Sequence, residues 1–266
     1  MNKLSVIIVN YNTKKLTLQC IKSVIEEGYG ILAEIIVVDN GSTDGSLAEL
    51  VKLTKSIKLI KNEKNLGFAK ANNQGIKIAK GKYILLLNSD TIVKKGTLQK
   101  LVHFAENKDD AGAVVPKLMN SDGSVQASVY NFPTLQRAVR QYWFGEKDLL
   151  DKYYPTDDTA VVIDMGVMAA FLITPSALKK IGLLNERYFM YYEDFDYCRE
   201  LRKAGLKTYY LPTAEVIHHH GASGNNVKDT NEQWKRLIPG SIIYHGRFRH
   251  YLLNFIIWSG QKFRKK

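Results

Sequence analysis

The chain has 266 residues, of which 45% are hydrophobic and 24% charged, the composition of an ordinary globular protein rather than a disordered one. At this length we expect one α/β domain with a substantial buried core and no second independent domain. Lysine and arginine outnumber aspartate and glutamate by 38 to 26, and the net charge of +12 favours anionic partners. Cys20 and Cys198 lie far apart without metal-ligand spacing, so the sequence does not support a disulfide framework or a zinc site, which fits a reducing cytoplasm.

No apolar run in the sequence is long enough to cross a membrane. The early run 4–9 stops at Asn10, so we interpret it as a strand and not as a secretion signal. No other run reaches the roughly 18 to 20 apolar residues that a spanning helix needs. We therefore expect a cytoplasmic protein that does not cross the membrane.

The first part of the chain alternates short β-branched runs with helical stretches, which predicts βαβ units around a parallel sheet. The expected strands are 4–9, 34–38, 57–60 and 82–87, and the expected helices are 13–26, 46–55 and 68–79. The second half is less regular, with a loop at 120–123, a strand at 160–173, a helix at 175–181, a helix from Glu193, short strands at 208–211 and 215–218, and a helix at 248–258. The predicted fold class is α/β, a mostly parallel sheet flanked by helices, with a basic helical tail.

Short polar clusters follow three of the predicted strands, at 10–12, 39–42 and 88–90. The carboxyl ends of parallel strands meet at one edge of a sheet, where ligands of such folds gather. Asp39 could accept hydrogen bonds from a nucleoside there, although a plain strand-to-helix turn capped by Asp44 or Ser46 explains the same residues.

The sequence has neither of the glycine loops that usually hold phosphates, G-x-G-x-x-G after the first strand or G-x-x-x-x-G-K-[ST] anywhere. A bound diphosphate would then need another counter-charge. Asp90 could hold a divalent cation for that purpose, but an Asn/Asp-rich turn is the alternative explanation.

Taken together, these segments resemble glycosyltransferase family 2, whose members have the glycosyltransferase A fold. The resemblance rests on 5–12, 37–44, Asn65 to Phe68 with Asn73 and Gly75, 88–90 and 189–196, which occur in the order of the family. Within the family, the chain is most similar to rhamnosyltransferase-like enzymes of surface polysaccharide synthesis. This resemblance implies a donor-binding half at about 1–115, an acceptor-binding half at about 116–230 and a basic extension at 231–266.

The resemblance implies that a nucleotide-diphosphate sugar binds at the strand ends. Asp39 would bind the pyrimidine base, and Asp90 would hold Mg²⁺ or Mn²⁺ against the diphosphate. The implied donor-binding residues are Val9, Asn10, Tyr11, Asp39, Asn65, Asn73, Asn88 and Ser89. His218 fits the position of a further metal ligand better than its neighbours His219 and His220, of which at least one is expected to be a surface group.

The resemblance also implies that Glu193 and Asp194 are the catalytic acidic residues, with Asp194 as general base in an inverting transfer. On a helix, Asp194 would share an apolar face with Tyr197, Cys198 and Leu201, which is unusual for a carboxylate. The alternative is a helix cap stabilised by the helix dipole.

The tail after Gln233 contains no acidic residue, and its apolar segment 248–258 has basic residues on both sides. A helix of this kind suits the surface of an anionic membrane, and we expect the protein to be peripheral at the cytoplasmic face. The alternative is a C-terminal helix packed on the body of the protein.

Three functions are consistent with these patterns. The first is a metal-dependent inverting glycosyltransferase that acts on a glycan or lipid-linked acceptor. The second is an inactive nucleotide-sugar-binding subunit, because Asn88 and Ala169 depart from the family pattern. The third is a nucleic-acid-binding protein, suggested by the positive charge, but the acidic clusters at the strand ends would repel phosphates and argue against it.

Overall fold

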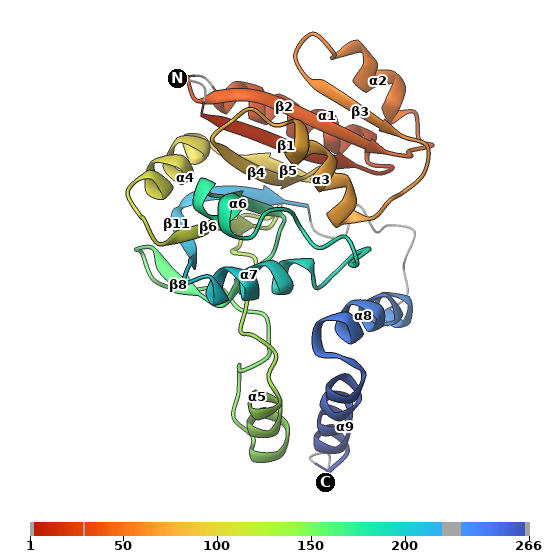
Figure 1. Cartoon of the computed structure of the whole chain (residues 1–266), viewed down its shortest axis with the longest axis vertical. Helices are drawn as coiled ribbons and strands as arrows, with labels where there is room; N and C mark the ends of the chain where they lie inside the picture. Colours follow the sequence, from red (N-terminus) through yellow and green to blue (C-terminus); the bar gives the residue numbers. More distant parts are fainter. Residues whose placement is uncertain (1–2, 29, 220–229, 264–266) are drawn as a thin grey trace.

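The computed structural model describes residues 3–28, 30–219 and 230–263. These residues form a body in which helices cover both faces of a large sheet, and a stalk that projects from one end (Figure 1). The stalk consists of the helices α5 (Leu135–Val139), η1 (Arg140–Phe144) and α9 (Arg247–Phe263). The other elements are the strands β1 (Leu4–Asn10), β2 (Leu32–Asn40), β3 (Lys58–Asn62), β4 (Tyr83–Asn88), β5 (Thr91–Val93), β6 (Ala111–Met119), β7 (Val129–Tyr130), β8 (Val161–Ile163), β9 (Met165–Gly166), β10 (Ala170–Ile173) and β11 (Lys207–His218), and the helices α1 (Lys14–Glu27), α2 (Ser46–Lys52), α3 (Phe68–Ile78), α4 (Thr97–Glu106), α6 (Pro175–Lys180), α7 (Glu193–Lys203) and α8 (Thr230–His245).

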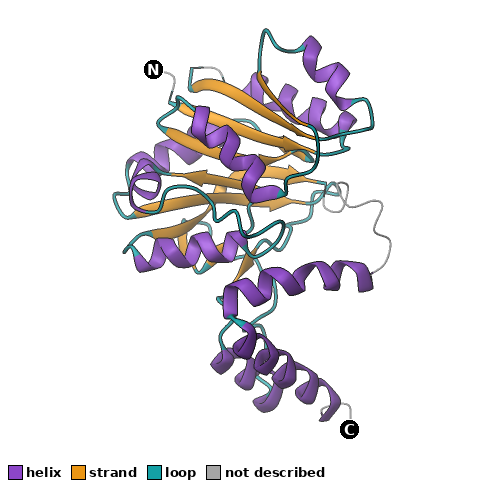
Figure 2. Ribbon diagram, turned by 45° about the vertical axis from the view of Figure 1, so that its right-hand side comes forward, coloured by secondary structure: helices purple, strands orange, loops and turns teal. Residues whose placement is uncertain are grey.

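The main sheet has the strand order β3-β2-β1-β4-β10-β6-β11-β5, with β8 paired to β11. Helices lie on both of its faces (Figure 2). Strands β3, β2, β1 and β4 run parallel, as do β6 and β11, while β10 runs antiparallel between β4 and β6. Asn10 lies opposite Asp39 on the neighbouring strand, and Val9 lies opposite Asn88. The polar ends of β1, β2 and β4 therefore meet at one edge, as predicted.

The core lies on both faces of the sheet, because the central strands are apolar at nearly every position and bury both sets of alternating side chains. On one face, Val6 and Ile8 of β1 pack in the same cluster as residues of α1, α2 and α4. On the other face, Ile7 packs in the cluster that includes residues of α3, α6 and α7. The predicted α/β class with a mostly parallel sheet is confirmed.

Several elements differ from the prediction. The elements β5, α4, β6, β7, α5 and η1 were not predicted. Residues 160–173 do not form one strand, because Met165–Gly166 pairs with β7 while Ala170–Ile173 joins the main sheet. The two strands predicted at 208–211 and 215–218 are one strand, β11, whose register against β6 shifts between Leu211 and Glu215.

The tail helix predicted at 248–258 lies within α9, which packs against α5 and η1 in the stalk. Leu253 and Ile256 of α9 form a small core with Ala138 of α5. Gly260 lets the helices approach closely, because a Cβ at this position would lie 2.4 Å from the carbonyl oxygen of Tyr142. None of the helices in the described ranges is long and apolar enough to span a bilayer.

Candidate active site

The side chains at the ends of β1 and β2 form a buried hydrogen-bond network. Asn10 donates from Nδ2 to Oδ1 of Asp39 over 2.7 Å, and its Oδ1 accepts from the hydroxyls of Thr13 and Thr17. The second oxygen of Asp39 accepts from the backbone N–H of Ser42. These contacts fix Asp39 and Asn10 at the strand ends, where the sequence predicted a nucleoside pocket. Tyr11, the next residue, is 42% exposed and provides an accessible ring beside this network.

Asn65 and Asn73, two further predicted donor-binding residues, also have partners within the protein. Asn65 accepts from the Asn40 side chain and from the backbone N–H of Gly67. Asn73 is buried on α3, where it donates to the carbonyl oxygen of Leu184 and accepts from the backbone N–H of the same residue. Both side chains thus hold loops in place at the edge of the site.

Asp90, just after β4, lies beside His218 at the end of β11. The distance from Asp90 Oδ1 to His218 Nε2 is 3.4 Å, and the two side chains are 3% and 8% exposed. The backbone joins the same segments, because the N–H of His219 donates to the carbonyl oxygen of Asp90 over 2.9 Å. Ser89 is tied to α1 through a 2.8 Å contact between its hydroxyl and that of Thr13.

The orientation of His218 is set by Gln126. The Gln126 amide nitrogen donates to Asn120 Oδ1 and to the carbonyl oxygen of His218, so its oxygen is left to accept from His218 Nδ1 at 2.7 Å. In a neutral imidazole with the proton on Nδ1, Nε2 carries a lone pair. Nε2 and the Asp90 Oδ1 are 3.4 Å apart, an arrangement that a metal cation between them would stabilise.

The structure places His219 differently from His218. Its Nδ1 lies 2.7 Å from the hydroxyl of Ser121, a contact at the surface of the protein. His220 lies outside the described residues. Within those residues, no group of three or more His, Cys, Asp or Glu side chains is arranged to hold a metal, so the protein itself offers the pair of Asp90 and His218.

Glu193 and Asp194, called here the acidic pair, begin α7. The two preceding residues, Tyr191 and Tyr192, have φ angles of 69° and 70°, the left-handed region that bulky residues rarely adopt. Strain of this kind is often found at functional sites. The N-cap is Tyr192, so Asp194 does not occupy the cap position of the alternative explanation; its Oδ1 accepts from the backbone N–H of Phe195 instead.

Burial makes both carboxyls of the acidic pair weaker acids than usual. It raises the pKa of Glu193 and of Asp194 above their ordinary values, and the charge of Asp194 raises the pKa of Glu193 further. Glu193 is only 8% exposed, and its Oε2 has no hydrogen-bond partner among the described residues. Glu193 is thus more deeply buried than its partner, whereas the helical periodicity had placed Asp194, and not Glu193, on the apolar face.

Lys152 and Tyr130 complete the surroundings of the acidic pair. The positive charge of Lys152 acts to lower the pKa of Asp194, and burial lowers the pKa of Lys152 itself. Burial, and secondarily the charge of Asp194, raises the pKa of Tyr130 to about 12. The Tyr130 ring lies 5.9 Å from Lys152 Nζ and 5.5 Å from the ring of Phe195. The site therefore combines one partly buried cation with two buried carboxyls.

Comparison with known proteins identifies the chain. Residues 5–172, more than half of its length, match the family described as Glycosyl transferase family 2. The chain belongs to this family.

Among curated relatives, this family 2 glycosyltransferase is 29% identical over 212 residues to an N-acetylglucosaminyl-diphospho-decaprenol L-rhamnosyltransferase of Mycobacterium tuberculosis, and the match covers 71% of the chain and 67% of the relative. It is 30% identical over 165 residues to the rhamnosyltransferase WbbL of Escherichia coli, covering 58% and 62% of the two chains. The predicted rhamnosyltransferase-like resemblance is confirmed.

Solved structures confirm the fold. The glycosyltransferase aligns with GalNAc-T7, crystallised with UDP, GalNAc and Mn²⁺, at a TM-score of 0.64 and 21% identity, over 82% of its own length and 43% of that chain. It aligns with residues 1–349 of Staphylococcus aureus TarS in complex with UDP at a TM-score of 0.59 and 16% identity, over 96% and 69% of the two chains. The chain therefore spans less than half of the first of these structures.

A series of contacts connects Asn88, at the end of β4, with the acidic pair at the start of α7. The backbone N–H of Asn88 donates to the carbonyl oxygen of Ala169, and that of Val167 donates to the carbonyl oxygen of Ser128. Tyr130, two residues after Ser128, then contacts Phe195 beside Asp194. These contacts join the segment that carries Asn88 to the segment that carries Asp194.

Reasoning from the sequence did not find Gln126, Lys152 or Thr13. Gln126 and Lys152 lie in irregular segments between strands, where no periodicity marks a residue as buried. Thr13 was assigned only to the start of a helix, yet its hydroxyl lies within hydrogen-bond distance of both Asn10 and Ser89. In each case the signal is a contact between distant segments, which a single sequence does not contain.

Proposed function

We propose that this glycosyltransferase moves a sugar from a nucleotide-diphosphate donor to a glycan or lipid-linked acceptor, with inversion at the anomeric carbon. The observation that carries this proposal is the acidic pair at the start of α7, in a chain whose family is known. Asp194 stays beside a partly buried lysine, and Glu193 keeps an unsatisfied oxygen in the same place. Buried carboxyls with raised pKa values are typical of groups that transfer protons.

In the proposed reaction, Asp194 accepts the proton of the acceptor hydroxyl as that oxygen attacks the anomeric carbon. The bond between this carbon and the diphosphate breaks, and the nucleoside diphosphate leaves. Burial raises the pKa of Asp194, so its carboxylate is a stronger base than an exposed aspartate and holds the proton that it accepts during the attack. Burial and the charge of Asp194 raise the pKa of Glu193, so Glu193 would hold the proton of the pair and leave Asp194 ionised to act as the base.

The donor is proposed to bind along the edge formed by β1, β2 and β4. Asp39, held by Asn10, would accept from the base, and Tyr11 offers the exposed ring nearby. Asn88 and Ser89 would contact the ribose and phosphates. Asn65 and Asn73 would act indirectly, by holding the loops that they bond.

The cation is proposed to be Mg²⁺ or Mn²⁺, held by Asp90 and His218. One carboxylate oxygen and one imidazole nitrogen are a suitable set for such an ion, and Gln126 fixes the imidazole in the tautomer that can coordinate. Donor phosphates and water would supply the remaining ligands. When bound, the ion neutralises the charge that develops on the leaving diphosphate.

The sugar and the acceptor are proposed from the relatives. Two of them are named as rhamnosyltransferases, and one is named for a diphospho-decaprenol acceptor, so rhamnose and a lipid-linked acceptor of surface polysaccharide synthesis are the first choices. A cavity of about 860 Å³ between α7, α5 and the α8–α9 turn supports an anionic acceptor. Its lining includes Arg137, Arg140, Arg199, Arg202, Lys203 and Arg249, and the first five of these form ion pairs with Asp164, Glu146, Asp196 or Glu200, so cations outnumber carboxylates there by six to four.

The decisive test of the proposal is the variant Asp194→Asn. The variant should bind nucleotide sugar like the wild type, seen as an equal thermal shift, but lose at least ~10²-fold in turnover, the usual scale for loss of a general base. Chelation with EDTA should abolish turnover of the wild type, and added Mn²⁺ should restore it.

The matched control is Asp157→Asn, which changes an exposed aspartate outside the site. It should leave turnover within about twofold of the wild type, because isolated surface substitutions have small effects. Full activity of Asp194→Asn would remove this residue from the mechanism. Absence of transfer by the wild type across nucleotide sugars would favour a binding subunit instead.

A further inference from the structure

The outer face of α9 exposes a row of aromatic side chains. Phe248, Tyr251, Phe255 and Trp258 are 79%, 64%, 54% and 55% exposed. Their spacings of three, four and three residues place them on one side of the helix. We call these four residues the aromatic stripe. The opposite side of α9 is occupied, because Leu253 and Ile256 pack on α5.

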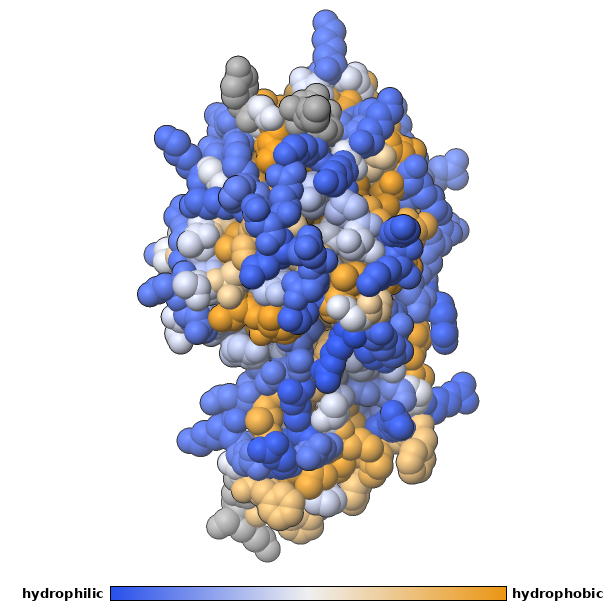
Figure 3. Space-filling model, turned by 60° about the vertical axis from the view of Figure 1, so that its left-hand side comes forward, coloured by the Kyte–Doolittle hydropathy of each residue, from blue (hydrophilic) through white to orange (hydrophobic). Residues whose placement is uncertain are grey.

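The exposed apolar surface continues at the far end of the stalk. Phe263 is 74% exposed at the end of α9, and Trp143 and Phe144 of η1 are 50% and 76% exposed. Trp143 is attached to α9 by a 2.9 Å hydrogen bond from its indole N–H to Ser259. The space-filling view shows hydrophobic residues gathered at this end of the molecule (Figure 3). Contiguous apolar surface of this kind marks a binding surface in a folded protein.

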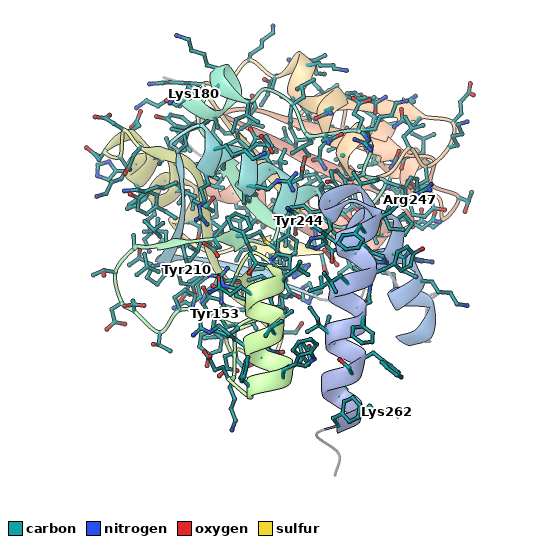
Figure 4. All side chains as sticks on the ribbon, turned by 60° about the horizontal axis from the view of Figure 1, so that its bottom comes forward. Tyr153, Lys180, Tyr210, Tyr244, Arg247 and Lys262 are labelled. Atoms are coloured by element: carbon teal, nitrogen blue, oxygen red, sulfur yellow. The ribbon has the colours of Figure 1, made fainter. Side chains whose placement is uncertain are left out.

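The charge around the stripe is positive at both ends. Arg247 lies at the start of α9 and Lys262 lies near its end, and α9 contains no acidic residue. Figure 4 shows Arg247 and Lys262 at opposite ends of the helix. Lys262 Nζ lies 5.1 Å from the centre of the Trp258 ring, so the cation and the aromatic surface are adjacent. Aromatic rings with flanking lysine and arginine are the features of helices that lie at the surface of anionic membranes.

We propose that the aromatic stripe docks on an anionic lipid bilayer, with α9 lying in the interface and the basic residues at the phosphate headgroups. This inference deepens the proposed function, on which it rests for the lipid-linked acceptor. The length of α9, 17 residues, and its packing on α5 fit a helix that lies on the membrane. A second copy of the chain is a less suitable partner, because two such helices would bring basic ends together in either direction.

The test is sedimentation of the full chain with vesicles of phosphatidylcholine alone and with vesicles containing phosphatidylglycerol. The wild type should bind the anionic vesicles, and binding should weaken as salt is raised. The double variant Phe255→Ser, Trp258→Ser should lower the partition coefficient at least ~10-fold, because two large apolar groups no longer enter the lipid. Both side chains are about half exposed, so the stalk should remain folded, which circular dichroism checks.

The matched control is Ile25→Ser, Val51→Ser, which removes two half-exposed apolar side chains from α1 and α2. It should bind vesicles like the wild type. The proposal is overturned if the wild type stays in the supernatant with anionic vesicles, or if the stripe variant binds as well as the wild type. It is also overturned if the wild type sediments as a dimer without lipid and the stripe variant as a monomer, since the stripe then serves self-association.

A second measurement separates this inference from the proposed function. Transfer to a water-soluble, short-chain diphosphate acceptor should be unchanged in the stripe variant, because Phe255 and Trp258 do not line the cavity beside α7 and are exposed on the other side of α9. Vesicle binding without any sugar transfer would reject the proposed function alone. Sugar transfer by a wild type that does not bind vesicles would reject only the proposal that the aromatic stripe docks on a membrane.

Discussion

At the scale of single residues, Glu193 and Asp194 are adjacent carboxyls whose pKa values are both raised by burial. Two adjacent buried carboxyls are rarely ionised together, because the negative charge of one raises the free energy needed to ionise the other. Lys152 relieves part of this cost for Asp194, and the backbone N–H of Phe195 donates to the same carboxylate. The negative charge of Glu193 is stabilised less, because its Oε2 has no hydrogen-bond partner among the described residues.

The burial of Glu193 predicts how this residue affects the stability of the folded protein as the pH changes. The folded state raises the pKa of Glu193 above its unfolded value near 4.3, so the folded protein holds the proton more tightly. Its contribution to stability is fully present below pH ~4 and is lost as the pH rises through the folded pKa. In the variant Glu193→Gln, the melting temperature relative to the wild type should therefore increase from pH 5 to pH 9.

Thermal unfolding over this pH range checks the prediction. The control Glu63→Gln replaces an exposed glutamate and should show a pH-independent difference from the wild type. A constant difference for Glu193→Gln as well would show that Glu193 is not held in its protonated form by burial.

Among single residues, the sequence located those at strand ends better than those in loops. Asp39, Asp90 and Asn10 follow apolar runs, so their place at the sheet edge could be predicted. Gln126 and Lys152 could not, because their importance comes from contacts with His218 and Asp194, far away in the chain. The deeper burial of Glu193 was also missed, since it depends on how the preceding tyrosines turn the chain and not on helical periodicity.

At the scale of elements, α3 and the loop before α7 are held together at the edge of the site. Phe68 N–H donates to the carbonyl oxygen of Phe189 over 2.7 Å, and Asn73 bonds Leu184 on the same loop. Gly67 has a φ of 85°, and a Cβ there would lie 2.4 Å from the Phe189 oxygen. The loop that leads into the acidic pair therefore needs glycine at this position.

The variant Gly67→Ala tests this coupling, with Gly123→Ala as its control. Both glycines have similar positive φ angles, but Gly123 has nothing within 4 Å of an added Cβ. Gly67 has φ 85° and ψ 171°, a backbone conformation that essentially only glycine adopts, so Gly67→Ala should lose at least ~1–3 kcal/mol more than Gly123→Ala through backbone strain and the clash together. Chemical denaturation measures the free energy of unfolding of both variants. An equal decrease in the two would show that the loop at Phe189 moves away from the added methyl group without loss of stability.

The regular elements of the first half could be predicted because each strand is an apolar run that ends in a turn. The second half was harder, since its strands are short or irregular. Pro116 lies inside β6, and β11 shifts register opposite that proline, so neither strand shows a continuous pattern. The short strand β9 leaves the main sheet to pair with β7, a choice that only tertiary contacts determine.

At the scale of the whole molecule, three surfaces are arranged around α7. The acidic pair begins the helix, the basic cavity lies along it at Arg199 and Arg202, and the stalk with the aromatic stripe projects beyond. Arg199 links these parts, because it donates to the carbonyl oxygen of Tyr244 and its guanidinium lies 4.1 Å from the centre of that ring.

Product analysis of a sugar-transfer reaction tests the central claim most directly. The wild type is incubated with Mn²⁺, individual nucleotide-diphosphate sugars and a lipid-diphosphate-linked sugar acceptor, and the acceptor is then examined by mass spectrometry. The account predicts an acceptor lengthened by one sugar with one donor of the panel, deoxythymidine-diphosphate rhamnose first, and one nucleoside diphosphate released per transfer. Unchanged acceptor with every donor, or an equal yield from Asp194→Asn, would contradict it.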